Sequence, residues 1–200
     1  NNDASEMATA AANGLLISNH SYGTVCGWDY NNDSSRWEFN GKYNEKEDYR
    51  FGLYDNQAVL YDSIAYNAPF YLIVKSAGNS RNQNGPAAGE YYLLRSTTDS
   101  SNIARAKNDG YDIISTSGTA KNILTVGAAT ISSLIPTKAA DLSISSFTGW
   151  GPTDDGRIKP DVMAIGTSMF STGSADDKAY STKSGTSMAS RSEEHTSELQ

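Results

Sequence analysis

Short apolar runs recur along the first 130 residues of the chain, separated by polar or helix-compatible segments. Each run has the length of a strand. Gly14 and Pro69 end the helices that precede two of them, and Ser117 and Gly118 give a turn signal before the last. The run Phe-Tyr-Leu-Ile-Val at 70–74 is apolar and β-rich, which is typical of a strand covered on both faces of a parallel sheet. Strands are predicted at residues 15–18, 70–74, 112–115 and 123–129.

Two helices are predicted between these strands. The first is Ala-rich, is capped by Asp3 or Ser5, and stops at Gly14 after about Asn13. The second covers 55–67 and ends before Pro69. Its N-cap is Asp55, and its apolar face is formed by Leu60, Ile64 and Ala68. Helices that alternate with strands indicate an α/β fold with parallel strands, because parallel neighbours need crossover connections.

Two long polar segments, 19–54 and 77–110, interrupt this alternation. The first is rich in Asn, Asp, Gly and Tyr and is too long for a simple connection. The second opens with a cluster of Gly, Asn and Pro residues at 78–86. We expect them to be surface loops that elaborate the fold. One hypothesis is that residues 24–54 bind a carbohydrate or another surface.

Composition excludes several classes of protein. With 200 residues, 38% of them hydrophobic, the chain can form one domain or part of one around a real core. A net charge of -7 argues against nucleic-acid binding, and no apolar run approaches the roughly 18 residues of a membrane span. Cys26 is the only cysteine, so the chain has no intrachain disulfide, and we expect a buried, unreactive thiol.

A candidate nucleophile lies near the end, in the run Ser-Gly-Thr-Ser-Met-Ala-Ser at 184–190. Ser187 has small neighbours, which leave room for a substrate carbonyl, and a helix-compatible segment follows it. A helix N-terminus there would supply hydrogen-bond donors and the positive end of a dipole. By itself, so short a motif also fits an ordinary loop serine.

Two further segments fit the handling of a peptide. Asn79 follows a predicted strand and Gly78, so its amide is expected at the carboxyl edge of the sheet, where α/β proteins place ligands. There it could donate to an oxyanion. Ser21, Tyr22 and Gly23 could pair their backbone with an extended peptide. Without further context, Asn79 could equally form a turn, and the segment at 21–23 could be a loop after a strand.

Four earlier blocks precede the serine block in the order found in subtilases, the serine endopeptidase family of subtilisin. They are Asn-His-Ser-Tyr-Gly at 19–23, Tyr-Leu-Ile-Val-Lys-Ser-Ala-Gly-Asn at 71–79, Lys-Asn-Ile-Leu-Thr-Val-Gly-Ala at 121–128, and Ser-Ser-Phe-Thr-Gly-Trp-Gly-Pro at 145–152 with Lys-Pro-Asp-Val at 159–162. The chain therefore resembles the C-terminal part of a subtilase catalytic domain. The resemblance implies a partial subtilisin-like, three-layer fold with a mostly parallel sheet over residues 1–190.

The resemblance also implies roles for single residues. Ser187 would be the nucleophile, and Asn79 would form the oxyanion hole together with the backbone N–H of Ser187. The substrate would be bound by Ser21, Tyr22, Gly23 and Gly78. The parent protein would then be a secreted or extracellular serine endopeptidase, acting on protein or peptide substrates through an acyl-enzyme.

The family's Asp and His blocks precede the substrate segment along the chain, and neither is found here. His20 lacks the His-Gly-Thr context of the family's base, and we interpret it as a packing or pocket-wall residue. We therefore expect residues 1–190 alone to be inactive. The alternative hypothesis is a pseudoprotease or peptide-binding domain that keeps the groove without catalysis.

Residues 191–200, Arg-Ser-Glu-Glu-His-Thr-Ser-Glu-Leu-Gln, differ in character from the rest. Arg191 stands where the family has a Pro, and the whole segment equals the in-frame translation of a common DNA-library adapter. We interpret it as an artefactual tail and exclude it, with His195, from the functional reasoning.

The implied chemistry needs no cofactor. Many subtilases bind calcium, and this chain has acidic loop residues at Asp154, Asp155, Asp161, Asp176 and Asp177. Their spacing matches no EF-hand loop, so a structural calcium ion stays open for the parent protein, with no ligands assigned.

Overall fold

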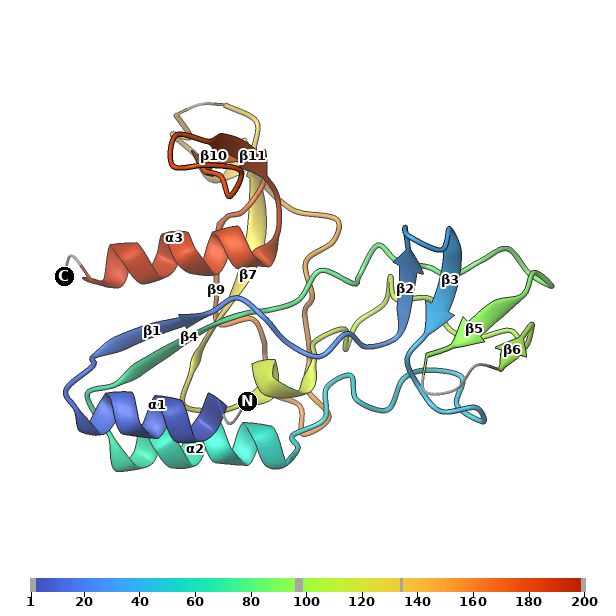
Figure 1. Cartoon of the computed structure of the whole chain (residues 1–200), viewed down its shortest axis with the longest axis horizontal. Coiled ribbons are helices and arrows are strands. Elements are labelled where there is room, and N and C mark those ends of the chain that lie inside the picture. Colours follow the sequence, from blue (N-terminus) through green and yellow to red (C-terminus); the bar gives the residue numbers. More distant parts are fainter. Residues whose placement is uncertain (1–2, 96–98, 134, 199–200) are drawn as a thin grey trace.

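The computed structural model describes residues 3–95, 99–133 and 135–198, with side chains up to residue 194. A central five-stranded sheet carries helices on both faces (Figure 1). Strands β1, β4, β7 and β9 run parallel, and β8 pairs antiparallel with β7. Their bounds are β1 (Ile17–His20), β4 (Leu72–Ser76), β7 (Leu124–Ile131), β8 (Leu142–Ile144) and β9 (Val162–Ile165). The predicted α/β fold with a mostly parallel sheet is confirmed.

The helices form the outer layers and are α1 (Asp3–Ala12), α2 (Asn56–Asn67) and α3 (Thr186–Glu198). Successive residues of a strand point to opposite faces of its sheet. On β4, Ile73 packs into the cluster that contains Tyr61 of α2, whereas Val74 packs into the cluster that contains Ala189 of α3. Helices α1 and α2 therefore cover one face, and α3 covers the other.

Capping residues set the start of α2 and the end of α1 where the sequence predicted them, whereas the predicted start of α1 is wrong, because Asp3 and Ser5 lie inside the helix instead of capping it. The Asp55 carboxylate accepts hydrogen bonds from the backbone N–H groups of Gln57 at 2.9 Å and Ala58 at 3.0 Å, which begins α2. After α1, Gly14 adopts the left-handed conformation with φ +92°, which a residue without a Cβ adopts easily.

The predicted apolar face of α2 is wrong at Leu60, which is 50% exposed. The buried residues of the helix are Ala58, Tyr61, Asp62 and Ile64. Asp62 is tolerated inside because its carboxylate accepts backbone hydrogen bonds from Lys121 at 2.8 Å and Asn122 at 2.6 Å. These bonds tie α2 to the segment that enters β7.

Strands β1 and β4 each begin two residues later than predicted. Phe70, which the apolar run placed in a strand, is 85% exposed, whereas Lys75 lies inside β4 and is only 2% exposed. Backbone pairing with β1 and β7 therefore includes a charged residue that an apolar pattern leaves out.

The predicted strand at 112–115 is wrong. Ile113 and Ile114 are buried, but their segment pairs with a loop: the N–H of Ile113 donates to the carbonyl of Trp150 at 2.7 Å. A short 3-10 helix, η1 (Thr116–Thr119), follows directly. A second one, η2 (Ala139–Asp141), precedes β8.

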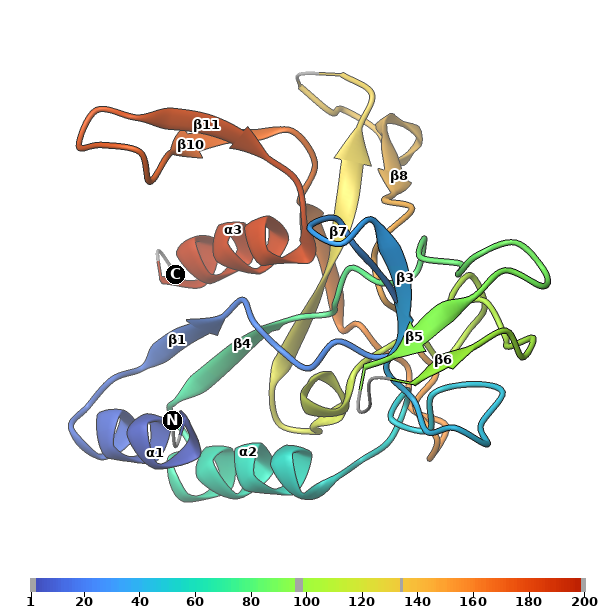
Figure 2. The ribbon, with the colours of Figure 1, turned by 45° about the vertical axis from the view of Figure 1, so that its right-hand side comes forward.

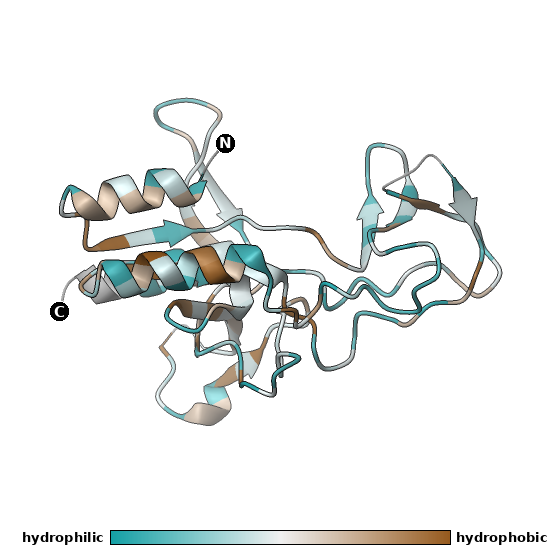
Figure 3. Ribbon diagram, turned by 90° about the horizontal axis from the view of Figure 1, so that it is seen from below, coloured by the Kyte–Doolittle hydropathy of each residue, from teal (hydrophilic) through white to brown (hydrophobic). Residues whose placement is uncertain are grey.

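Parts of the two segments predicted as loops, 19–54 and 77–110, fold together into a second, four-stranded sheet. Its strands are β2 (Trp28–Asn31), β3 (Arg36–Phe39), β5 (Tyr92–Leu94) and β6 (Ser100–Ser101). Trp28, Phe39, Tyr92 and Leu94 form its core, and the rings of Trp28 and Tyr92 lie 4.6 Å apart, edge to face. This small sheet stands at one end of the molecule, beyond connecting segments that are largely hydrophilic (Figure 3).

Asn108 connects the small sheet to the segment that follows β4. Its buried amide donates to the carbonyls of Trp28 at 3.1 Å and Ser80 at 3.0 Å. Its oxygen accepts from the N–H of Trp28 at 3.3 Å. One side chain thus bridges two parts of the chain that are far apart in sequence.

A hairpin of β10 (Met169–Thr172) and β11 (Tyr180–Lys183) lies above α3 (Figure 2). Helix α3 continues through residue 198, so the segment interpreted as an artefactual tail is helical that far. Arg191 and Glu194 form an ion pair at 3.2 Å. The side chain of His195 and residues 199–200 lie outside the described part. No helix within the described ranges is long and apolar enough to cross a membrane.

Candidate active site

A pocket of about 280 Å³ lies where β1 and β4 end and α3 begins. Its lining includes every site residue predicted from the sequence: Ser21, Tyr22, Gly23, Gly78, Asn79 and Ser187. The first three follow β1, the next two follow β4, and the last lies in the first turn of α3. The carboxyl ends of adjacent parallel strands meet at one sheet edge, which explains why distant segments converge there.

Ser187 is bound to the segment after β1 by a reciprocal pair of hydrogen bonds. Its hydroxyl donates to the carbonyl of Ser21 at 3.1 Å, and the Ser21 hydroxyl donates to the carbonyl of Ser187 at 3.1 Å. As the second residue of α3, Ser187 has a backbone N–H in the helix turn that lacks intrahelical partners. The hydroxyl and a free donor therefore lie in the same turn.

The amide of Asn79 has its orientation set by Thr186, the first residue of α3. Its oxygen accepts from the Thr186 backbone N–H at 2.8 Å and from the Thr186 hydroxyl at 2.9 Å. A backbone N–H can only donate, so the oxygen must face Thr186 and the NH₂ group must face away. Within the described residues that NH₂ group donates to no atom. It is a positioned donor beside the turn that carries Ser187.

The segment after β1 has unpaired backbone. The N–H groups of Tyr22 and Gly23 make no hydrogen bond with the described residues. An unpaired edge of this kind can receive an extended peptide as an added strand. A Cβ on Gly23 would lie 3.4 Å from Nζ of Lys75 and 3.7 Å from Oγ of Ser115, so glycine keeps this side of the pocket open.

The family model of the Subtilase family, Peptidase_S8, matches residues 1–190. The chain belongs to the subtilase family. The match ends at Ser190, immediately before the segment at 191–200. No curated protein matches the subtilase chain.

Two solved structures share its fold. The Prenylagaramide maturation protease PagA has a TM-score of 0.51 and 15% identity, with 94% of this chain and 44% of that one covered. Sphericase has a TM-score of 0.51 and 20% identity, with 98% and 46% covered. The chain thus spans less than half the length of these structures, and at this identity the likeness shows the fold alone.

His20 lies on β1 and is buried, and both of its ring nitrogens are occupied. One hydrogen-bonds the Ser18 hydroxyl at 2.7 Å and the other the Tyr22 hydroxyl at 2.6 Å. Burial, together with the charge of Lys75, lowers the pKa of His20 to about 4. It is a neutral histidine at pH 7 and shares no hydrogen bond with Ser187 in the described part of the subtilase chain.

Two of the acidic loop residues, Asp155 and Asp161, are bonded to neighbouring side chains. Hydrogen bonds from Arg157 and Thr153 lower the pKa of Asp155 to about 2, and Asp161 pairs with Lys159 at 2.7 Å. Among residues 3–95, 99–133 and 135–198, no group of three or more His, Cys, Asp or Glu side chains is placed to hold a metal ion.

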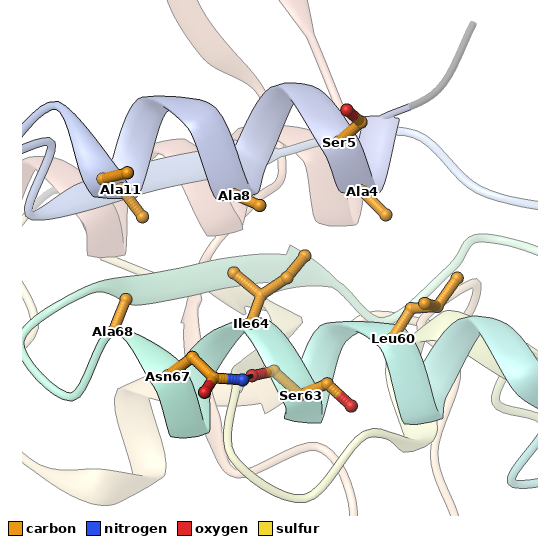
Figure 4. Close-up of a pocket in the computed structure, with 10 residues that line it drawn as sticks. Ala4, Ser5, Ala8, Ala11, Leu60, Ser63, Ile64, Asn67 and Ala68 are labelled. Carbon is orange, nitrogen blue, oxygen red and sulfur yellow. Dashed lines mark hydrogen bonds between the residues drawn. The ribbon is translucent and has the colours of Figure 1, made fainter.

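A larger cavity of about 610 Å³ lies between α1 and α2 (Figure 4). Its walls are mainly alanines, with Leu60 and Ile64 facing across from α2 (Figure 4). The polar residues there are Ser5, Ser63 and Asn67. Among the described residues, no titratable side chain that could activate a serine lines this cavity. Size alone therefore does not mark the active site of this subtilase.

Lys75 and Ser115 also line the pocket, and the sequence analysis assigned them no role. Ser115 lay in the strand predicted at 112–115, and Lys75 lay within the matched block at 71–79. The signal available for Lys75 was its charge beside the apolar run at 70–74, where a lysine needs a reason to be buried.

Proposed function

We propose that this chain forms part of a serine-type endopeptidase that cleaves internal peptide bonds through an acyl-enzyme. Membership of the subtilase family supports the reaction class. The observation that carries the proposal is the orientation of Asn79, whose NH₂ group is directed away from Thr186 beside the turn that carries Ser187. A structural asparagine would not need its donor left free in a pocket that contains a serine.

In the proposed reaction, Oγ of Ser187 bonds to the carbonyl carbon of the substrate while its proton passes to a base. The Asn79 amide and the Ser187 N–H stabilise the resulting oxyanion, and one such side-chain donor was worth about 3 kcal/mol in subtilisin. The C–N bond then breaks, the amine leaves with the proton, and water releases the acyl group. The unpaired N–H groups of Tyr22 and Gly23 align the peptide.

The base is the family's histidine, in a block that we did not find in this sequence. His20 is bonded elsewhere. His195 is eight residues beyond Ser187 on α3, about 12 Å along the helix axis at 1.5 Å per residue. We therefore propose that the chain by itself has no peptidase activity. For the parent protein we propose protein or peptide substrates, a secreted or extracellular location and a reaction without cofactor.

The test is Ser187→Ala in the full-length parent protein. We expect turnover of a casein substrate to fall by at least about 10⁴-fold, and covalent labelling by a fluorophosphonate probe to vanish. The variant should stay folded, with at most a small decrease in the thermal unfolding midpoint, because the hydroxyl's hydrogen bond to the Ser21 carbonyl is lost. Ser171→Ala, which removes an exposed serine on β10, should leave all three measurements as they are.

Two outcomes would overturn the proposal. One is activity retained by Ser187→Ala. The other is a folded parent protein that binds peptides but neither cleaves them nor reacts with the probe, which would identify the alternative pseudoprotease.

A further inference from the structure

Lys75 is a buried cation in the wall of the candidate active site. Its side chain is 2% exposed, and it lines the same pocket as Ser187 and Asn79. Burial lowers the pKa of its ammonium group to about 8, so the group is still largely protonated at pH 7. A charge in such surroundings normally has an anionic partner.

Among the described residues, no carboxylate lies within ion-pair distance of Lys75, and the charge of Asp3 acts on it only from farther away. Nζ of Lys75 donates to the backbone carbonyls of Tyr22 and of His20, the latter at 3.3 Å. Both acceptors are neutral. Asp29, which also lines the pocket, is paired with Arg95 at 3.6 Å.

Lys159 provides an internal comparison. It is also buried, at 5% exposed, but its ammonium pairs with the Asp161 carboxylate at 2.7 Å and contacts the Thr125 hydroxyl at 3.2 Å. Among the described residues, Lys159 therefore has a carboxylate in direct contact, whereas Lys75 has none within 4.0 Å.

Gly23 lies beside Lys75 in the wall of the pocket. A Cβ built on that glycine would lie 3.4 Å from Nζ, 3.7 Å from the Ser115 hydroxyl and 3.8 Å from the Ser117 hydroxyl. One ammonium group and two hydroxyls thus surround the space that the missing side chain leaves open. All three can donate hydrogen bonds to a carboxylate.

We propose that Lys75, with Ser115, binds the carboxylate of an Asp or Glu side chain of the substrate, at the residue that provides the scissile carbonyl. This inference rests on the proposed function, because it assumes that the carbonyl sits between Ser187 and Asn79. The side chain next to that carbonyl then enters the pocket that these residues share with Lys75. Lys75 is a specificity-determining residue and takes no part in bond breaking.

The experiment compares peptides that differ only at this position, with Glu or Gln, in the full-length parent protein at pH 7. We expect kcat/KM for the Glu peptide to exceed that for the Gln peptide by at least tenfold. In Lys75→Met the Glu peptide should lose at least tenfold and the Gln peptide less than threefold. Lys178→Met removes an exposed lysine near β11 and should retain the wild-type ratio.

The outcomes separate this inference from the proposed function. A wild-type Glu-to-Gln ratio near one overturns the inference even if the Lys75 variant does not fold, while fluorophosphonate labelling of Ser187 keeps the peptidase assignment. If Lys75→Met folds and is labelled, but its kcat/KM falls by the same factor for both peptides, Lys75 has only a structural role. If wild type is not labelled and cleaves neither peptide, the proposed function itself has failed.

Discussion

Asn79 and Thr186 join the carboxyl end of β4 to the first residue of α3 through two hydrogen bonds, at 2.8 Å and 2.9 Å, on one amide oxygen. The same oxygen cannot then serve the substrate, so the amide's two functions fall on different atoms. The oxygen caps the helix, and the nitrogen is available for chemistry.

This division predicts that the two functions can be separated. In the parent protein, Asn79→Ala should lower kcat by about 10²- to 10³-fold and destabilise the fold by about 1 kcal/mol, because the helix also loses its cap. Asn79→Asp keeps an acceptor for Thr186 and replaces the donor, so kcat should fall while the unfolding midpoint stays near wild type. Equal loss of stability in both variants would contradict this account.

Because His20 is buried in its neutral form, we expect the fold to lose stability in acid. Its pKa is about 4 in the folded chain, below the ordinary value of 6.5, so the unfolded chain binds more protons between these two values. Stability should rise as pH increases from 4 to 6.5, by up to about 3 kcal/mol at 1.36 kcal/mol per pKa unit. Urea unfolding at several pH values measures this slope.

His20→Gln is the matched variant, because glutamine can bond Ser18 and Tyr22 without titrating. Its stability should change less than that of wild type between pH 4 and 6.5. An unchanged slope would assign the acid sensitivity to other groups.

The pKa of Lys75 sets a pH limit on the proposed acid selectivity. The ammonium form prevails below about pH 8, so the Glu-to-Gln ratio of kcat/KM should be constant from pH 6 to 7 and should decline above about 8. His20, Tyr22, Asp3 and Asp29 are the titratable groups near this lysine or in its pocket.

Using a ratio removes the titration of the catalytic base, which affects both peptides alike. Since kcat/KM reports the free enzyme, its ratio should decline near the pKa of the unliganded lysine; a bound carboxylate favours the protonated lysine, so any decline in kcat for the Glu peptide should begin at higher pH. A ratio that stays constant to pH 10 would exclude Lys75 as its source.

Substitution of Trp28 tests whether the small sheet has a hydrophobic core of its own. Its ring is 3% exposed and packs against Phe39 and Tyr92, so Trp28→Ala should destabilise that sheet by about 3–5 kcal/mol. Limited proteolysis should then cut within 28–54 before the central sheet. Trp37→Ala changes a ring that is only partly buried and should destabilise the small sheet less. Equal resistance of both variants to the protease would argue against a separate core.

Local signals in the sequence predicted the helices well. Asp55 and Gly14 act through bonds and dihedral angles within a few residues of themselves, so the start of α2 and the end of α1 could be predicted without tertiary information. The strands were less exact because backbone pairing sets their ends. Phe70 is apolar yet exposed, and Lys75 is charged yet paired within β4.

The small sheet could not be predicted because its contacts are non-local. Glu38 of β3 pairs in register with Leu93 of β5, on the far side of α2 and β4 in the sequence. The pocket was the opposite case. All six candidate residues lie together because each follows a strand or begins a helix at the same sheet edge. The role of Lys75 could not be predicted in this way, because it depends on which charged groups lie near its ammonium group in the folded chain.

Asn108 connects the small sheet directly to the segment that carries Asn79. Its amide fixes Trp28 on one side and Ser80 on the other, and Ser80 is the neighbour of Asn79. A shift of Trp28 would therefore act, through a single amide, on the residue next to Asn79. In the proposed peptidase, substitutions in the small sheet would be limited by their effect on the position of Asn79.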